Sequence, residues 1–343
     1  MVIRAVELGG NVVLAGQGSL AVGDFGTPGG GTARAFVRAD IPALGVGNAG
    51  SDPVDYYYNA FTARPTFGPG LTSVLDSLAN SGGGDKFGFI ETTLLNGDKD
   101  PFFVPDGYAS GAQLSFYSVW QNETFASLGI QHGIYDYGLT NGESIRLEAT
   151  QTVSVEIRAQ QVGNSVRISG SGALDLGAFG APGGGTARAF VRADIPALGV
   201  GNAGGDPVDY YYNAFTTRPT FGPGLFSVLD SLADSGSGDK FGFIETTLLN
   251  GDKDPFFVPD GYASGDPLAF SSIWQNETFA SLGIDPGIYL FGLTDGQTIA
   301  LTIDDTLVPV PLPGTAVMLA VGLLGLGSLV RRDRAAGARQ TAS

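Results

Sequence analysis

The sequence predicts an all-β protein, with two tandem β-sandwich or jelly-roll-like domains followed by a C-terminal transmembrane helix. Three observations support this prediction: a long internal repeat, a composition rich in glycine and aromatic residues, and one uncharged apolar stretch near the C-terminus. The 343 residues include 54 Gly, 22 Phe and 12 Tyr, and only 15% are charged, which is typical of a chain with many strands and turns. This length is sufficient for two domains with separate cores.

The internal repeat has a spacing of 154 residues. Residues 26–111 return as residues 180–265 with scattered changes. A period of this length corresponds to a whole domain and not to one turn of a solenoid. We therefore predict copy one at 1–150 and copy two at 151–305. Because the copies have diverged little, a residue that both share is not thereby marked as functional.

Alternating apolar and polar residues predict half-buried strands in each copy, for example at Leu114–Trp120 and Thr298–Ile303. Residues 134–149 predict a hairpin, because two alternating arms flank Asn141-Gly142, a pair that favours a type I′ turn. Many short strands with glycine-rich turns are typical of sandwiches.

Helix is expected in few places. Apolar residues with helical spacing at 71–78, repeated at 225–232, predict one short helix in each copy. Thr124 is expected to cap a single turn that ends near Leu128.

The N-terminus falls inside a predicted strand. Residues 3–5 align with residues 157–159, which the strand-like residues 151–156 precede in copy two. Met1 therefore lies within the first strand of copy one. We expect the true N-terminus, with a signal peptide, to lie upstream.

Composition excludes several classes of function. The formal net charge of −16 repels phosphate backbones, so we expect no nucleic-acid partner. The absence of cysteine excludes disulfides, thiolate metal sites and a cysteine nucleophile. His132 is the only histidine, and Pro286 replaces it in copy two, so neither a histidine triad nor a multi-histidine metal site can form. We expect no catalytic residues.

One acidic loop in each copy is a candidate calcium site. Each places three oxygen-bearing side chains at alternate positions, as calcium loops do, although proline follows the third where an EF-hand has glycine. The candidate ligands are Asn96, Asp98, Asp100, Asn250, Asp252 and Asp254. The alternative is a solvated acidic turn, and no other cofactor is expected.

Other motifs have both a functional and a structural interpretation. Gly45-x-Gly47-x-x-Gly50 matches the dinucleotide pattern, but strand-like residues follow where a helix is needed, which favours a loop. Residues 56–58, all tyrosine, and Trp120 would stack on sugar rings if exposed, whereas aromatic residues in a sandwich more often belong to the core.

A catalytic carboxylate pair has no specific support. Two acids such as Glu91 and Asp98 would serve glycoside hydrolysis only if they faced each other across a cleft.

The C-terminal stretch predicts a membrane span. Residues 314–330 carry no charge and are apolar on every face; seventeen residues of helix cover about 25 Å, close to the ~30 Å of a bilayer core. Arg331, Arg332 and Arg334 follow, and positive charge beside a span stays cytoplasmic. The alternative is a buried C-terminal helix. The predicted segments are a stalk at 306–313, the transmembrane helix at 314–330 and a basic cytoplasmic tail at 331–343.

The C-terminus resembles a known sorting signal. Val310-Pro311-Leu312-Pro313, the apolar span and the arginine cluster are similar to the VPLPA variety of the PEP-CTERM signal of Gram-negative envelope proteins, except that Gly314 replaces the usual alanine. Residues 238–289 also resemble the body of many PEP-CTERM surface proteins. The resemblance implies insertion in the inner membrane with the domains on the periplasmic side. It also implies cleavage by an exosortase, an intramembrane protease, and then display at the cell surface or secretion.

We therefore expect a non-enzymatic protein of the cell envelope or extracellular matrix, with a structural role at the surface. Its expected partners are an exosortase, the membrane and extracellular polysaccharide. The alternative is a glycan-binding adhesion module, calcium-dependent if the acidic loops bind the ion, and a glycoside hydrolase is third.

Overall fold

A computed structural model describes residues 1–39, 41–69, 77–90, 100–223, 231–244 and 254–304. These residues belong to one compact unit, Met1–Thr306. In this part of the chain the protein is all-β, with three one-turn helices at η1 (Gly23–Phe25), α1 (Phe125–Leu128) and α2 (Phe279–Leu282). The all-β prediction is therefore confirmed for the described residues, and their several sheets are consistent with a β-sandwich architecture.

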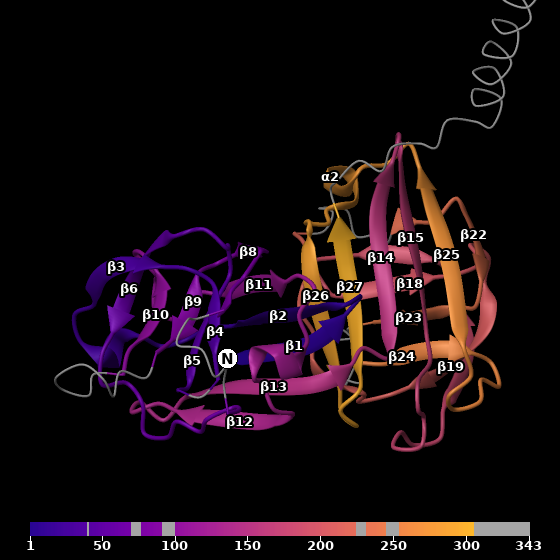
Figure 1. Cartoon of the computed structure of the whole chain (residues 1–343). Coiled ribbons are helices and arrows are strands. Elements are labelled where there is room, and N and C mark those ends of the chain that lie inside the picture. The colour runs from indigo at the N-terminus through magenta and orange to yellow at the C-terminus, as the bar shows by residue number, and fades with distance from the viewer. Residues whose placement is uncertain (40, 70–76, 91–99, 224–230, 245–253, 305–343) are drawn as a thin grey trace, which may run out of the picture. The chain divides into compact units, whose positions relative to one another are not determined.

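Copy one consists of two packed sheets (Figure 1). The sheet that holds its first and last strands, here the terminal sheet, has the order β12 (Gly133–Gly138), β13 (Ser144–Thr152), β1 (Val2–Leu8), β2 (Asn11–Gly18), β11 (Leu114–Trp120), β8 (Ser81–Gly84). The second sheet, here the aromatic sheet, has the order β3 (Gly29–Ala33), β6 (Asp52–Tyr57), β10 (Phe102–Pro105), β9 (Phe87–Phe89), β5 (Ala43–Val46), β4 (Phe36–Arg38), β7 (Ser77–Leu78).

Copy two repeats this topology. Its terminal sheet has the order β20 (Phe215–Thr217), β26 (Gly287–Leu293), β27 (Thr298–Asp304), β14 (Val155–Val162), β15 (Ser165–Gly172), β25 (Leu268–Gln275), β22 (Ser235–Gly238). Its aromatic sheet has the order β16 (Gly183–Ala187), β19 (Asp206–Tyr211), β24 (Phe256–Pro259), β23 (Phe241–Phe243), β18 (Ala197–Val200), β17 (Phe190–Arg192), β21 (Ser231–Leu232).

The first and last strands of each copy pair in parallel. β1 lies beside β13, with Arg4 opposite Glu148, and β14 lies beside β27 in the same way. Only residues 153–154 separate β13 from β14. The prediction of strand at residues 151–156 at the start of copy two holds only for residues 155–156, which begin β14; residues 151–152 end the last strand of copy one, where Thr152 pairs with Glu7 of β1.

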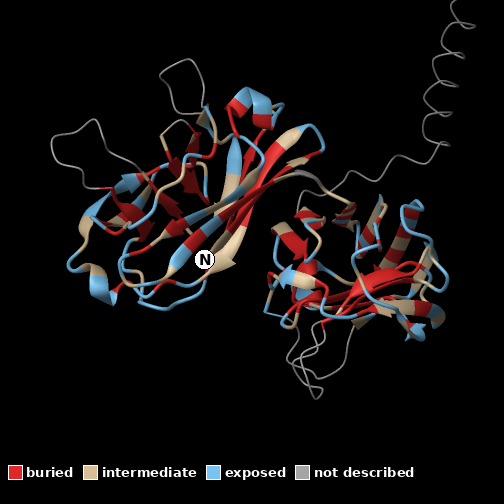
Figure 2. Ribbon diagram, turned by 90° about the horizontal axis from the view of Figure 1, so that it is seen from below, coloured by how far each residue is buried: buried red, intermediate tan, exposed pale blue. Residues whose placement is uncertain are grey.

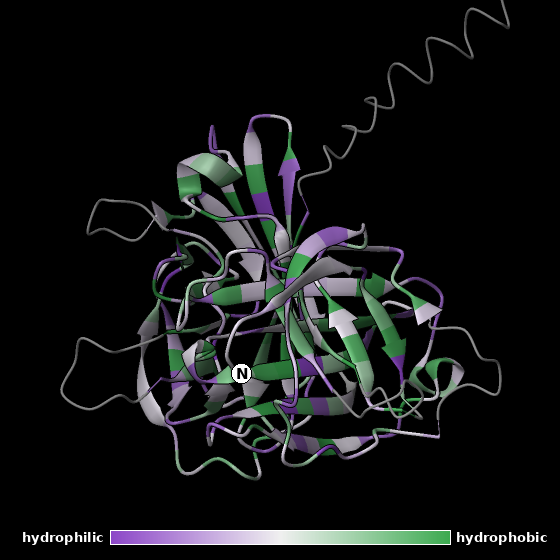
Figure 3. Ribbon diagram, turned by 90° about the vertical axis from the view of Figure 1, so that its left-hand side faces the viewer, coloured by the Kyte–Doolittle hydropathy of each residue, from purple (hydrophilic) through white to green (hydrophobic). Residues whose placement is uncertain are grey.

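The core of each copy lies between its two sheets. Alternate side chains of β1 and β2 point inward, so that Ile3 and Leu14 join the core. Trp120 is completely buried there, and its indole Nε1 donates to the Ser77 carbonyl over 3.1 Å. Buried residues form stripes along the strands of both copies in Figure 2, and most hydrophobic segments in Figure 3 also fall on strands.

The predicted hairpin is present, but its turn is of another type. β12 and β13 pair from Gly138 and Ser144 onward, and the Leu139 N–H donates to the Glu143 carbonyl over 2.8 Å. Gly142 has φ +88°, whereas Asn141 is not in the left-handed region that a type I′ turn needs at both central positions. The connection is therefore a three-residue loop with a glycine at its left-handed position.

The helix predictions have mixed outcomes. Thr124 caps α1, since its hydroxyl accepts from the Ser127 N–H over 3.1 Å, as predicted. Leu78 and Leu232, the last residues of the two helical-spacing series, lie in strands β7 and β21. Residues 71–76 and 225–230 lie outside the described residues.

Tyr137 carries an unsatisfied hydroxyl in the core of copy one. Its side chain is completely buried, and its hydroxyl has no hydrogen-bond partner. Burial raises the pKa of this hydroxyl far above its usual value. Phe291 occupies the equivalent position in copy two, packed on Phe243 as Tyr137 packs on Phe89. Copy two thus shows that the site accepts phenylalanine.

We expect Tyr137→Phe to increase the free energy of unfolding by about 1 kcal/mol, because it removes a buried polar group that lacks a partner. The reverse change in copy two, Phe291→Tyr, serves as the control and should decrease stability by a similar amount. Urea denaturation measures both. A Tyr137→Phe variant less stable than the parent would mean that the hydroxyl has a partner in solution.

Candidate functional site

The glycine motif at Gly45–Gly50 begins in strand β5 and continues as a tight loop that leads to β6. Gly47 has φ +100°, and a side chain there would meet the Asp85 carbonyl oxygen. The buried Ser118 hydroxyl accepts from the Gly47 N–H over 2.9 Å and donates to its carbonyl over 2.8 Å. The glycine is therefore needed for close approach of the backbone.

A buried lysine fills the inside of this loop. The Lys86 Nζ donates to the carbonyls of Asn48 and Gly50, the latter over 3.0 Å, and lies 3.3 Å from the Asp52 carboxylate. Burial lowers the pKa of Lys86. Lys240 makes the same contacts in copy two. Strand β6 begins at Asp52, so the loop lacks the following helix that a dinucleotide site needs.

The outer side of the aromatic sheet carries a row of rings and glycines. Neighbouring strands place these residues opposite one another in register. The row in copy one is Gly29, Tyr56, Phe103, Gly88, Gly45 and Phe36. The same row recurs in copy two as Gly183, Tyr210, Phe257, Gly242, Gly199 and Phe190.

Each ring on this side lies against a glycine. A side chain at Gly31 would meet the Tyr56 ring at 2.6 Å, and one at Gly29 would meet the Tyr58 ring at 3.0 Å. The Tyr56 and Tyr58 rings are stacked, with centroids 6.3 Å apart and an interplanar angle of 21°. The Tyr56 hydroxyl donates to the Thr32 carbonyl over 3.1 Å, and burial raises its pKa. The glycines of strand β3 thus leave room for two tyrosine rings to pack directly on its backbone.

The structure shows which of the candidate aromatic residues are exposed and which are buried, a distinction that the sequence alone left open. Tyr58 is 41% exposed and Tyr56 is partly buried, whereas Tyr57 and Trp120 belong to the core. In copy two, the Tyr210 and Tyr212 rings are stacked at 6.3 Å, and Tyr212 is 43% exposed. Each copy therefore presents one tyrosine pair, here called the tyrosine platform: Tyr56 with Tyr58, and Tyr210 with Tyr212.

Most of the predicted calcium ligands lie outside the described residues, namely Asn96, Asp98, Asn250 and Asp252. Asp100 and Asp254 are described; each is largely buried and forms an ion pair, with Arg64 and Arg218 respectively. A guanidinium beside the carboxylate opposes a second cation there. Among the described residues, no three acidic or histidine side chains cluster as metal ligands would.

The remaining candidates are placed as follows. His132 packs on Phe125 beside α1, with ring centroids 5.1 Å apart. Glu91, the other half of the carboxylate pair, lies outside the described residues together with Asp98.

The sorting motif Val310, Pro311, Leu312 and Pro313, the predicted span at 314–330 and the cluster Arg331, Arg332 and Arg334 also lie outside the described residues. In the part of the chain that the structure describes, no helix has the length and apolarity to cross a membrane.

Comparison with known proteins gives no family model, no curated protein and no solved structure that matches this chain.

Sequence reasoning missed the buried lysine of the glycine loop. The signal that could have found it is the single lysine of Gly-Asp-Lys-Phe-Gly, at Lys86 and Lys240, set between residues of predicted strands. An isolated lysine in such a position must either reach solvent or find buried oxygen partners.

We expect Lys86→Met to lower the free energy of unfolding by about 2 kcal/mol, because two loop carbonyls lose their buried donor. The matched control is Arg158→Met, which removes an exposed ion pair with Glu156 and should change stability by less than about 0.5 kcal/mol. Urea denaturation of both variants makes the comparison. Equal stability of the Lys86→Met variant and the parent would show that the ammonium does not hold the loop.

Proposed function

We propose that the chain is an exported, exosortase-sorted protein of the cell envelope or extracellular matrix, with a structural role at the surface and no enzymatic activity. The observation that carries the proposal is the succession at the C-terminus: Val310–Pro313, the uncharged residues 314–330 and the arginine cluster that begins at Arg331. The sandwich domains and the net charge of −16 support it, because acidic β-modules stay soluble and repel one another at a crowded surface.

In this proposal the transmembrane helix at 314–330 holds the two copies on the periplasmic side of the inner membrane. The arginines keep the tail cytoplasmic. Cleavage near residues 310–313 then frees the two domains for the cell surface or for secretion.

Mass spectrometry of the protein from a Gram-negative host that makes an exosortase tests this function. We expect the mature chain to lack residues 314–343 in this host and to keep them in a strain without the protease. The matched control replaces Pro311 and Pro313 by alanine, which should leave the span attached and the protein in the membrane fraction. A wild-type chain that ends at Ser343 in the protease-containing host would contradict the proposal.

A second candidate function is glycan binding, and the tyrosine platform favours it. The apolar faces of sugar rings pack on exposed aromatic rings, and two nearly parallel rings 6.3 Å apart offer a continuous surface to such a ligand. The platform occurs in both copies, so that one chain can hold a polysaccharide at two points. The negative net charge favours a neutral glycan.

Affinity electrophoresis in gels containing hydroxyethyl cellulose or dextran, two neutral glucans, tests this candidate. We expect Tyr58→Ala with Tyr212→Ala to weaken the affinity measured by retardation about 30-fold, because each platform loses a stacking face worth about 1 kcal/mol and the two losses add when one polysaccharide binds both platforms. Leu78→Ala with Leu232→Ala, exposed residues at the far edge of the same sheets, should leave retardation unchanged. Absence of retardation of the parent in both gels would reject binding to these glucans.

A further inference from the structure

The terminal sheets of the two copies have matching strand orders. Each residue on the outer face of one sheet, the face turned away from its own core, therefore has a counterpart on the other sheet. On β1, β2 and β11 of copy one the outward side chains are mainly apolar, and their counterparts in copy two are mainly polar or charged. The replaced pairs, copy one first, are Val2 and Glu156, Val6 and Gln160, Val13 and Arg167, Ala15 and Ser169, and Tyr117 and Ser271. Inward positions of the same strands stay apolar in both copies, as at Ile3 and Ile157.

The opposite change occurs on the other half of the sheet. On β12 and β13 of copy one, Asp136 and Arg146 form an exposed ion pair of 2.6 Å. Leu290 and Ala300 replace them in copy two. Copy two therefore has an apolar patch where copy one has a charged surface.

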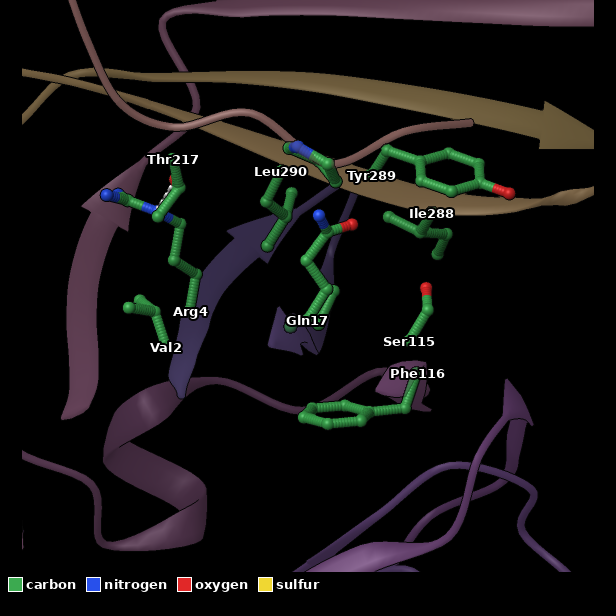
Figure 4. Close-up of a pocket in the computed structure, with 12 residues that line it drawn as sticks. Val2, Arg4, Gln17, Ser115, Phe116, Thr217, Ile288, Tyr289 and Leu290 are labelled. Carbon is green, nitrogen blue, oxygen red and sulfur yellow. Dashed lines mark hydrogen bonds between the residues drawn. The ribbon is translucent and has the colours of Figure 1, made fainter. Parts of the chain in front are cut away.

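These two apolar surfaces form one buried cluster. Its members from copy one are Val6, Leu8, Val13, Ala15 and Val119, and those from copy two are Leu290 and Ala300. Leu290 is 4% exposed and Ala300 is fully buried. A cavity of about 30 Å³ remains beside the cluster, lined by Arg4, Phe116 and Leu290 among others (Figure 4). The contact is thus closely packed.

Arg4 adds directional hydrogen bonds to this contact. Its Nε donates to the Thr217 hydroxyl and its Nη2 to the Thr216 hydroxyl, both over 2.7 Å, and Figure 4 shows the guanidinium beside Thr217. Nη2 also lies 2.5 Å from the Glu148 carboxylate of the neighbouring strand. Thr217 is specific to copy two, since Ala63 is its counterpart in copy one.

The corresponding arginine of copy two has no such role. Arg158 is exposed and pairs with Glu156 on its own strand over 3.3 Å. With Ser169, Gly170 and Ser171, these two residues line an open hollow of about 360 Å³, at the positions equivalent to part of the cavity wall in copy one. This face of copy two is polar and open.

The linker between the copies supports a fixed contact. It consists of Val153 and Ser154 only. Val153 packs on the same apolar cluster, and the Ser154 N–H donates to the Thr298 carbonyl over 2.8 Å. A two-residue linker bonded at one end and packed at the other leaves little freedom between the copies.

We propose that the duplicated domains have become a complementary docking pair, and that the charged counterparts of the two docking faces prevent further copies from adding. A contact between two different faces of one fold leaves one face free at each end, so identical copies would continue to add until they form a ring or a filament. Repeat proteins end such series with polar outer faces. Here the polar ends are the Asp136–Arg146 pair on copy one and the Glu156–Arg158 face on copy two.

Restoring the copy-one residues on copy two tests the docking. Leu290→Asp with Ala300→Arg should separate the domains without unfolding them, because copy one carries these residues in the same fold. We expect a larger radius of gyration by X-ray scattering and two calorimetric transitions in place of one. The reverse change in copy one, Asp136→Leu with Arg146→Ala, is the control and should leave both readouts unchanged. Parent-like scattering and a single transition in the Leu290→Asp, Ala300→Arg variant would overturn the docking.

A variant designed to oligomerise tests whether the charged outer faces of the two copies prevent further copies from adding. The variant combines the control change in copy one with apolar replacements on copy two: Glu156→Val, Gln160→Val, Arg167→Val, Ser169→Ala and Ser271→Tyr. Each residue introduced is the one that the other copy carries at that position. We expect the variant to form concentration-dependent oligomers by sedimentation velocity and the parent to sediment as a monomer. A variant with unchanged circular dichroism that stays monomeric would overturn the role of the charges.

Discussion

The parallel pairing of the first and last strands is the constraint on which the rest of each copy depends. It places both ends of a copy at the centre of one sheet, with Arg4 opposite Glu148 in copy one. The chain therefore leaves copy one next to the strand where that copy began, and two residues are enough to start copy two. The same pairing brings β1 and β13 together on the outer face, where the buried Arg4–Glu148 pair lies. The docking surface and the short linker thus both follow from one strand arrangement.

The second general feature is the match between rings and glycines, which explains the composition. A flat ring that covers a neighbouring backbone needs a residue without a side chain beneath it, and Phe36 over Gly45 is one example, where a side chain at Gly45 would approach the ring at 2.7 Å. Glycine weakens an isolated strand, and the covering ring protects its exposed backbone. Glycine and aromatic content therefore rise together, and the outer side of the aromatic sheet carries a buried hydrophobic cluster of its own.

The all-β fold could be predicted from the alternation of apolar and polar residues. A strand that buries one face has an apolar residue at every second position, as in Leu114–Trp120. The glycine loop was harder. Lys86 is held by main-chain carbonyls, and no pattern of side chains reveals a main-chain oxygen. The turn at Asn141 was assigned the wrong type because the Asn-Gly pair fits both a two-residue and a three-residue connection, and only the pairing of Leu139 with Glu143 distinguishes them. The sequence likewise could not predict that Tyr58 is exposed and Tyr57 buried, because this depends on which face of the strand the second sheet covers.

The two copies can be compared residue by residue as two sequences with one fold. The positions at which they differ say more about the contacts of each copy than the positions at which they agree. Shared residues such as Lys86 and Lys240 are explained by a common loop, and a recent duplication preserves them whether or not they matter. A coordinated set of differences on one face, by contrast, indicates that the environments of that face differ between the copies. The outward positions of the terminal sheets exchange apolar for charged residues in opposite directions on two halves of the sheet, from Val13 to Arg167 on one half and from Arg146 to Ala300 on the other. Random drift on two solvent-exposed faces would not make those exchanges complementary, whereas burial of one half of each sheet against the other copy requires it.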